Sequence, residues 1–192
     1  FLLIGLSAFA LFRFVWMNLQ YPIQYDEAWN YNYFLHGSFV NSIIAYNNYP
    51  FHNLISYPFI KLLGAEVWVL RFPSLLFAIA TMYALYMVVQ QLFSNKQLSA
   101  LASILFVALP GVVYYSFYAR GVMIHLFFAV WICFYTIKMV ENKFSFSKII
   151  FVAILHSFAC WSMLSHIYLM GVAFLFAIVV SMIQRSLRYL TQ

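Results

Sequence analysis

Charged residues are scarce in this sequence. Asp, Glu, Lys and Arg together make up 7% of the 192 residues, and only four residues are acidic. About a quarter of the residues in soluble globular proteins are charged, so this composition excludes a soluble domain. Low charge combined with high hydrophobicity also excludes an intrinsically disordered chain.

Clusters of like charge, cysteine motifs and metal-binding spacings are missing as well. The ten basic residues form no stripe or patch, which excludes a nucleic-acid-binding surface. The two cysteines, Cys133 and Cys160, lie in separate apolar segments at different depths, so we expect no disulfide. The sequence has no HExxH or CxxC spacing, and therefore no local zinc motif.

Hydrophobic residues are abundant instead. They make up 66% of the chain and include 22 Phe and 15 Tyr. A helix needs about 20 apolar residues to cross the hydrocarbon core of a bilayer. We therefore predict an all-α, polytopic transmembrane helix bundle in which residues 1–192 form one module. The six expected spans are residues 1–19, 68–93, 98–110, 121–140, 149–165 and 168–183.

Two of these spans have unusual features. The chain begins inside an apolar run, so we expect residues 1–19 to be the truncated first span of a longer or processed chain. A signal peptide does not fit, because Arg13 interrupts the run and no small-residue cleavage site follows. We expect Arg13 to have a structural ion-pair partner. The third span is short, and Pro110 and Gly111 mark a break within it.

The basic residues predict the orientation of the bundle. With the N-terminus in the cytoplasm, six basic residues fall at inner ends and three at the outer side, which agrees with the positive-inside rule. The inner residues are Lys96, Lys138, Lys143, Lys148, Arg185 and Arg188, and the outer ones are Lys61, Arg71 and Arg120. Because the loops are compact, we expect a bacterial inner (cytoplasmic) membrane, with the site facing the periplasm or the exterior.

The long first loop, residues 20–67, is rich in aromatic and asparagine side chains. This composition is typical of helices that lie in the membrane interface. We predict two such helices, DEAWNYNYFLHG and PFHNLISYPFIKLLG, ending near Gly37 and Gly64. The simplest role for the two adjacent acids is that Asp26 caps the first helix and that Glu27 is solvated.

Four short motifs occur in a defined order along the outer side. They are Arg13 followed after twelve residues by DEA, then NNYPFHNL, LRFPSLL and SFYARGV. In this order they resemble the N-terminal half of the GT-C membrane glycosyltransferases. The nearest resemblance is to the branch that contains protein O-mannosyltransferases and the aminoarabinose transferases that modify lipid A.

The resemblance implies an activity and its partners. Such enzymes take a sugar from a polyprenyl-phosphate carrier in the membrane and pass it to a lipid, glycan or protein acceptor. A carboxylate then removes the proton of the acceptor hydroxyl, and direct displacement inverts the anomeric carbon. Asp26 matches the first acidic position and is the expected general base. Glu27 is the second candidate catalytic residue, which orients the acceptor, shares a metal with Asp26, or pairs with an arginine.

The leaving phosphate needs cationic or amide donors. Arginine holds phosphate oxygens through two parallel hydrogen bonds and stays protonated, so Arg71 and Arg120 are expected to bind it. The alternative for both is snorkelling to lipid headgroups. The other residues expected to bind substrate are Asn48, His52, Tyr118 and His166.

The histidines are candidate ligands for a divalent cation as cofactor. His52 and His166 both lie on the outer side, where they can approach the two acids. Without a local ligand motif, however, we expect no obligatory metal. His125 and His156 fall inside spans and are expected to form hydrogen bonds between helices.

Two other classes of function stay open. A non-catalytic scaffold subunit of a larger membrane assembly would tolerate replacement of Asp26 without loss of activity. A transporter would place ionisable residues or broken helices near the middle of the membrane, whereas the carboxylates here gather at its outer boundary.

Overall fold

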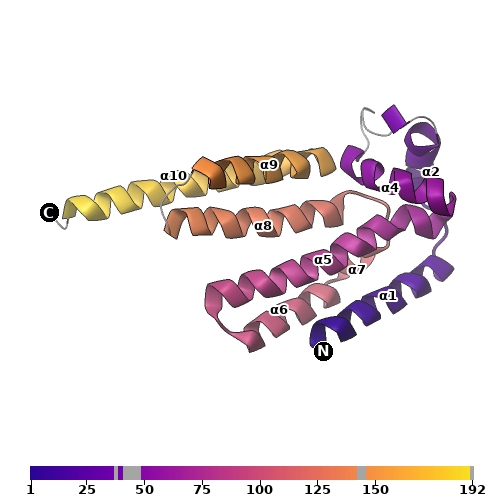
Figure 1. Ribbon diagram of the computed structural model, residues 1–192, viewed down its shortest axis with the longest axis horizontal. Coiled ribbons are helices and arrows are strands. Elements are labelled where there is room, and N and C mark those ends of the chain that lie inside the picture. Colours follow the sequence, from indigo (N-terminus) through magenta and orange to yellow (C-terminus); the bar gives the residue numbers. More distant parts are fainter. Residues whose placement is uncertain (37–38, 41–48, 142–145, 191–192) are drawn as a thin grey trace.

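The computed structural model describes residues 1–36, 39–40, 49–141 and 146–190, which form helices and no β-strand (Figure 1). The helices of the first half are α1 (Leu2–Gln20), α2 (Tyr25–Asn30), the π-helix η1 (Tyr31–Leu35), α4 (Pro50–Leu63) and α5 (Val67–Phe93). Those of the second half are α6 (Lys96–Ala108), α7 (Pro110–Ser116), α8 (Val122–Glu141), α9 (Phe146–Ser162) and α10 (His166–Leu190).

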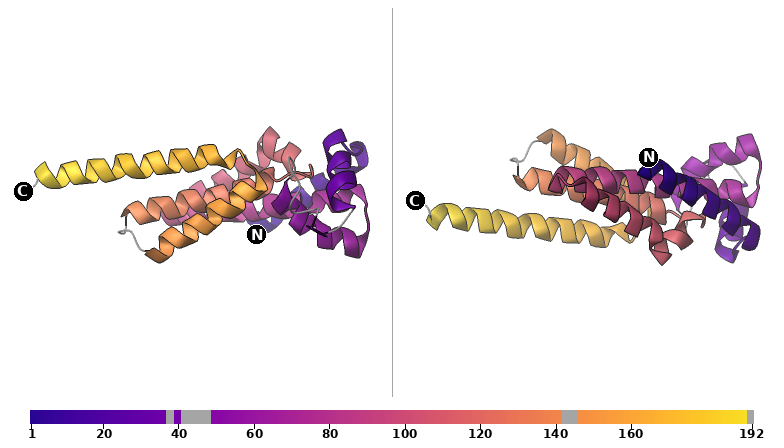
Figure 2. Two further views of the ribbon diagram at one scale, coloured as in Figure 1. Left: turned by 90° about the horizontal axis from the view of Figure 1, so that it is seen from above. Right: turned by 90° about the horizontal axis from the view of Figure 1, so that it is seen from below.

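Helix α5 lies at the centre of the bundle and packs against α1, α4, α6, α7 and α8. Helix α9 packs on α8, and α10 contacts both. The short helices α2 and α4 gather at one end of the bundle, which we call the site end, while α10 runs past the opposite end (Figures 1 and 2).

The predicted all-α membrane bundle is confirmed. In the described part of the chain, α1, α5 and residues 122–139 of α8 are long and apolar enough to cross a membrane. The pair α6 and α7 makes a fourth span if the two are counted together across their 65° bend, which lies at the predicted Pro110 break. Helix α9 and the start of α10 are apolar but shorter, so six apolar helical segments occupy the six predicted positions.

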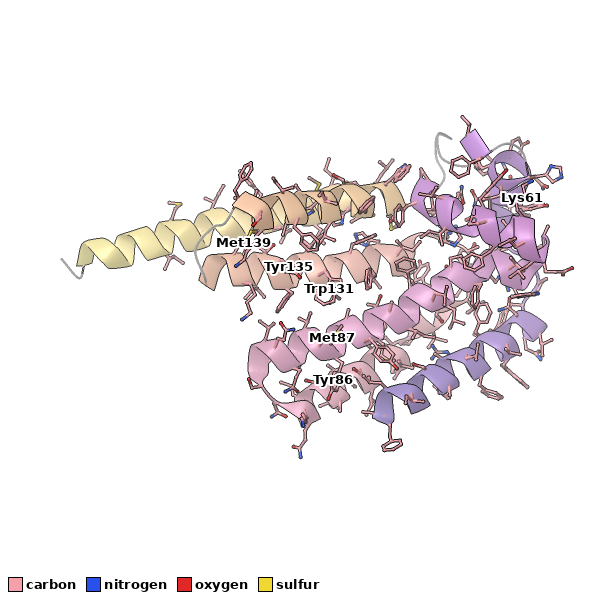
Figure 3. The ribbon with its side chains drawn as sticks, in the orientation of Figure 1. Lys61, Tyr86, Met87, Trp131, Tyr135 and Met139 are labelled. Carbon is pink, nitrogen blue, oxygen red and sulfur yellow. The ribbon has the colours of Figure 1, made fainter. Side chains whose placement is uncertain are left out.

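Aromatic side chains fill the contacts between the helices away from the site end. Figure 3 shows Trp131 and Tyr135 on α8 in the middle of the bundle, and Lys61 at the site end. The Tyr135 ring meets the Phe151 ring of α9 at 4.9 Å. Such edge-on ring pairs add stability beyond the area that they bury.

Both helices predicted in the first loop form; the end of α4 agrees with the prediction, whereas the start of α2 differs from it. Gly64 ends α4 with a φ of +91°, which favours glycine. The predicted cap by Asp26 is wrong: the N-cap is Gln24, two residues earlier, and α2 begins at Tyr25. The carboxylate of Glu27 reaches back to accept the backbone N–H of Gln24 at 2.9 Å, as the third helical residue does in a capping box. Gly37 lies outside the described residues.

Arg13 caps the end of α6 in place of the expected ion pair. Its Nη1 donates to the Val107 carbonyl at 2.8 Å, just before the Pro110 break frees the last carbonyls of α6. Among the described residues no carboxylate contacts Arg13, and its buried Nε has no hydrogen-bond partner. A cation at a helix C-terminus also complements the helix dipole.

Replacing Arg13 with Met is expected to lower the free energy of unfolding by about 1.5–3 kcal/mol, the usual contribution of a hydrogen bond to a charged group. Thermal unfolding in detergent measures this loss. Phe12→Leu, on the same helix at a side chain 67% exposed, is the matched control and should change little. Equal melting temperatures for Arg13→Met and wild type would contradict the capping role.

Three histidines connect the last three helices. Nε2 of His125 on α8 lies 2.8 Å from Nδ1 of His166, and Nε2 of His166 lies 2.8 Å from Nδ1 of His156 on α9. This confirms His125 and His156 as interhelical partners. It also places both ring nitrogens of His166 within this chain of histidines, so the predicted substrate contact of His166 has no free ring nitrogen here.

Candidate active site

A buried ion pair joins α2 to α5 at the site end. The side chains of Glu27 and Arg71 are 1% and 0% exposed. Nε of Arg71 donates to Oε1 of Glu27 at 2.9 Å, and Nη2 donates to Oε2 at 2.7 Å. These parallel bonds form the bidentate geometry that makes an arginine–carboxylate pair strong and directional.

Arg71 uses all five of its N–H groups inside the protein. Besides the two bonds to Glu27, Nη1 donates to Oδ1 of Asn18 and to the Tyr21 carbonyl, both at 3.1 Å. Nη2 donates to the Pro22 carbonyl at 2.9 Å. No N–H of Arg71 is left for the expected phosphate contact, and its burial excludes snorkelling. Arg71 instead fixes the end of α1 and the following turn to α5.

Both carboxylate oxygens of Glu27 are also hydrogen-bonded within the protein. Its Oε1 also accepts the backbone N–H of Ala119 at 2.8 Å, and its Oε2 accepts that of Gln24. The carboxylate therefore connects α2, α5 and the turn of residues 117–121, which we call the outer turn after its predicted side of the membrane. Of the three roles considered for Glu27, pairing with an arginine is the one seen in this structure.

Asp26 has the opposite environment. Its side chain is 49% exposed and forms an ion pair with Arg120, whose side chain is 27% exposed. Consecutive residues of a helix point in different directions, so one turn of α2 buries Glu27 and presents Asp26 to the solvent. The two adjacent acids thus have one structural and one accessible carboxylate.

Aromatic rings hold the Arg120 guanidinium. It lies 4.8 Å from the centre of the Tyr118 ring and 5.8 Å from that of Tyr49, within the range of cation–π contacts. Its Nε is buried and has no hydrogen-bond partner within the described part of the chain. Burial lowers the pKa of Arg120, yet arginine stays charged at neutral pH. Burial, with the nearby Tyr114, raises the pKa of Tyr118 to about 12, so its phenol stays neutral.

The outer turn that carries Arg120 is fixed through its backbone. The Tyr118 carbonyl accepts the Ser74 hydroxyl and the Arg120 N–H, each at 2.7 Å. At Gly121, a Cβ atom would lie 2.1 Å from the Ser162 carbonyl oxygen, so only glycine fits against the end of α9. The position of Arg120 is therefore set by α5 and α9 as well as by its own segment.

His52 is buried beside Ser74, the residue that bonds the outer turn to α5. It is fully buried on α4, with Nε2 3.4 Å from Oγ of Ser74 and Nδ1 3.2 Å from Oγ of Ser56. Because the Ser74 hydrogen points to the Tyr118 carbonyl, His52 donates through Nε2 and accepts through Nδ1. Burial lowers the pKa of His52 to about 4, so the imidazole is neutral. His52 is thus enclosed beneath the predicted substrate site.

The neutral His52 predicts acid sensitivity. An unfolded chain binds a proton at the ordinary pKa of 6.5, whereas folded His52 stays neutral down to about pH 4. Protonation of the unfolded state therefore lowers stability progressively between these values, by up to about 3 kcal/mol. Unfolding of wild type and His52→Gln in detergent between pH 7 and 4 measures the effect. The variant should lose less stability on acidification, and an identical loss would contradict this assignment.

The site therefore brings some of the predicted residues together and separates others. Asp26, Arg120 and Tyr118 lie together, and Glu27, Arg71 and His52 lie beneath them. Asn48 lies outside the described residues. The sequence analysis did not select four buried or partly buried polar residues of this region. Ser74 and Asn53 lie within the LRFPSLL and NNYPFHNL motifs, whereas Asn18 and Asn30 lie outside all four motifs. The side-chain amides of Asn30 and Asn53 exchange hydrogen bonds of 2.8 and 3.0 Å. Within the described residues no group of three His, Cys, Asp or Glu side chains has metal-binding geometry.

Comparison with protein families identifies the chain. The model of the dolichyl-phosphate-mannose-protein mannosyltransferase family matches residues 48–191, which is more than half of the sequence. The chain belongs to this family. It is therefore placed among the membrane glycosyltransferases of the mannosyltransferase type, as the four motifs indicated. The matched range contains Arg71 and Arg120, while Asp26 and Glu27 precede it.

The other comparisons add no relative. Neither the search of curated proteins nor the search of solved structures gives a significant match.

Proposed function

We propose that the site end is the catalytic end of a glycosyltransferase that moves a sugar from a polyprenyl-phosphate carrier to an acceptor hydroxyl. The observation that carries this proposal is the accessible Asp26 carboxylate beside Arg120, on a support made rigid by the buried Glu27–Arg71 pair. Asp26 is the general base, and Arg120 binds the phosphate of the donor.

The chemistry requires two groups of opposite charge at this place. Asp26 removes the proton of the acceptor hydroxyl while the acceptor oxygen attacks the anomeric carbon. The bond between that carbon and the phosphate oxygen breaks, and its electron pair leaves with the carrier phosphate. Arg120 stabilises the developing charge through its N–H groups. One direct displacement inverts the anomeric configuration.

The supporting residues act through position. Glu27 accepts the Ala119 N–H, and Ser74 donates to the Tyr118 carbonyl, so the backbone on both sides of Ala119 is fixed. We assign Glu27, Arg71 and His52 to this positioning role. Preorganised charges avoid the cost of rearrangement during the reaction, which is why a rigid support contributes to rate.

The membrane supplies the donor. A polyprenyl chain lies in the hydrocarbon, and its phosphate lies at the boundary with water, which is where helices such as α2 and α4 are expected. The excess of basic residues at the opposite ends of the spans supports an outward-facing site. We propose the inner membrane of a bacterium as the location, with a lipid, glycan or protein as acceptor.

The donor class is the test of this function. Membranes that contain the full-length parent protein should transfer labelled mannose from polyprenyl-phosphate mannose and should leave GDP-mannose unused. Membranes without the protein are the control, and the anomeric configuration of the product, determined by NMR, should be inverted. Transfer from the nucleotide sugar alone would overturn the proposal. Absence of transfer from every lipid-linked donor would favour the non-catalytic scaffold.

A further inference from the structure

The proposed base and the proposed phosphate ligand contact each other in this structure. The Asp26 carboxylate forms an ion pair with the Arg120 guanidinium. If both residues act as proposed, this contact cannot persist during the reaction. A carboxylate that neutralises Arg120 weakens its attraction for phosphate, and a guanidinium at Asp26 stabilises the charged form and makes the carboxylate a poorer base.

Arg120 is built to stay in place when its partner leaves. The rings of Tyr118 and Tyr49 hold the guanidinium, and the outer turn is bonded to Ser74 and Glu27. Asp26 is held less tightly, because half of its side chain is exposed and Arg120 is the one ion-pair partner that the described residues give it. Of the two partners, the carboxylate is therefore the one that can move.

A donor phosphate competes for the same N–H groups. It carries at least one negative charge and presents several acceptor oxygens, and arginine binds such groups in a forked geometry. The Nε of Arg120 is buried and lacks a hydrogen-bond partner among the described residues, so it is a further N–H group of the guanidinium that the Asp26 carboxylate leaves unbonded. A phosphate in this forked geometry can therefore take the place of the Asp26 carboxylate on Arg120.

We propose that the donor phosphate displaces Asp26 from Arg120, so that binding of the lipid-linked sugar releases the base and must precede deprotonation of the acceptor. This inference rests on the proposed function and adds an order of events to it. Without donor, Asp26 stays paired and the acceptor hydroxyl keeps its proton. With donor, the phosphate occupies Arg120 and the free carboxylate faces the acceptor.

Equilibrium binding of polyprenyl phosphate, the carrier without its sugar, tests this competition without any reaction. The full-length protein is reconstituted in nanodiscs, and the dissociation constant is measured for wild type, Asp26→Asn, Asp26→Ala and Arg120→Gln. Removing the competing charge should tighten binding by about two- to fivefold in both Asp26 variants, as expected for a partly exposed ion pair. Arg120→Gln should weaken binding by about tenfold or more.

Glu66→Gln is the matched control, because Glu66 is an exposed acid just before α5 that forms no ion pair among the described residues. Its affinity should equal that of wild type. Unchanged affinity in both Asp26 variants, with weakened binding in Arg120→Gln, would overturn the competition and leave the phosphate site intact. Unchanged affinity in all variants would overturn the assignment of Arg120 itself. Neither result depends on the transfer assay, which tests the proposed function separately.

Discussion

Asp26→Asn is expected to lower the rate of sugar transfer by a factor of about 10² to 10⁴, the usual contribution of a general base. Asparagine keeps the shape of aspartate and its place on α2, but its amide cannot accept the proton of the acceptor hydroxyl. Because the Asp26 side chain is half exposed, the substitution should leave the fold unchanged. The loss should therefore appear in the chemical step, while binding of the donor stays at least as tight as in wild type.

The measurement is initial transfer from a polyprenyl-phosphate donor, in membranes that contain equal amounts of wild-type and variant full-length protein. Glu66→Gln removes another exposed acid near the same end of the bundle and should transfer sugar at the wild-type rate. Undiminished transfer by Asp26→Asn would remove this residue from the role of base.

Glu27→Gln is expected to lower the stability of the protein, whereas Asp26→Asn is expected to lower the rate of sugar transfer. Removing one partner of a buried ion pair leaves an uncompensated charge and typically costs about 3–5 kcal/mol. Here the remaining group is the fully buried Arg71 guanidinium. Gln would also lose the strong acceptors for the backbone N–H groups of Ala119 and Gln24. We expect a large fall in the melting temperature, or little folded protein.

Thermal unfolding in detergent measures this difference, with Asp26→Asn as the control one residue away. The double variant Glu27→Leu, Arg71→Met removes both charges and should recover part of the stability, because apolar replacement of a buried pair is often neutral. It should not recover activity, since the outer turn and the end of α1 lose their anchors. A melting temperature of Glu27→Gln equal to that of wild type would contradict the structural role.

Hydropathy and the positions of proline and glycine were sufficient to predict the general architecture. The apolar runs identified the helical segments, Pro110 marked the bend between α6 and α7, and Gly64 ended α4. These features depend on local properties of the chain, such as the fixed φ of proline and the access of glycine to positive φ. The resemblance of four motifs then identified the family.

The contacts within the site depend on how the helices are aligned, which the local sequence does not specify. Arg71 and Glu27 are 44 residues apart and meet only because α1, α2 and α5 converge. For the same reason, the sequence does not reveal that the N–H groups of Arg71, predicted to bind phosphate, are all bonded within the protein in this structure. The predicted Asp26 cap is wrong because α2 already begins at Tyr25, so Asp26 lies within the first turn, where Glu27 accepts the Gln24 N–H.

The acceptors of Arg71 also bear on how the protein is made. Arg71 follows all the residues that accept its hydrogen bonds, which are Asn18, Tyr21, Pro22 and Glu27. Synthesis proceeds from the N-terminus, so these residues are made before Arg71. A lone arginine is costly for a segment that enters the bilayer. When α5 leaves the ribosome, every acceptor for its arginine has already been synthesised. The charge of Arg71 can therefore be neutralised as soon as α5 inserts into the membrane, before the second half of the bundle has been synthesised.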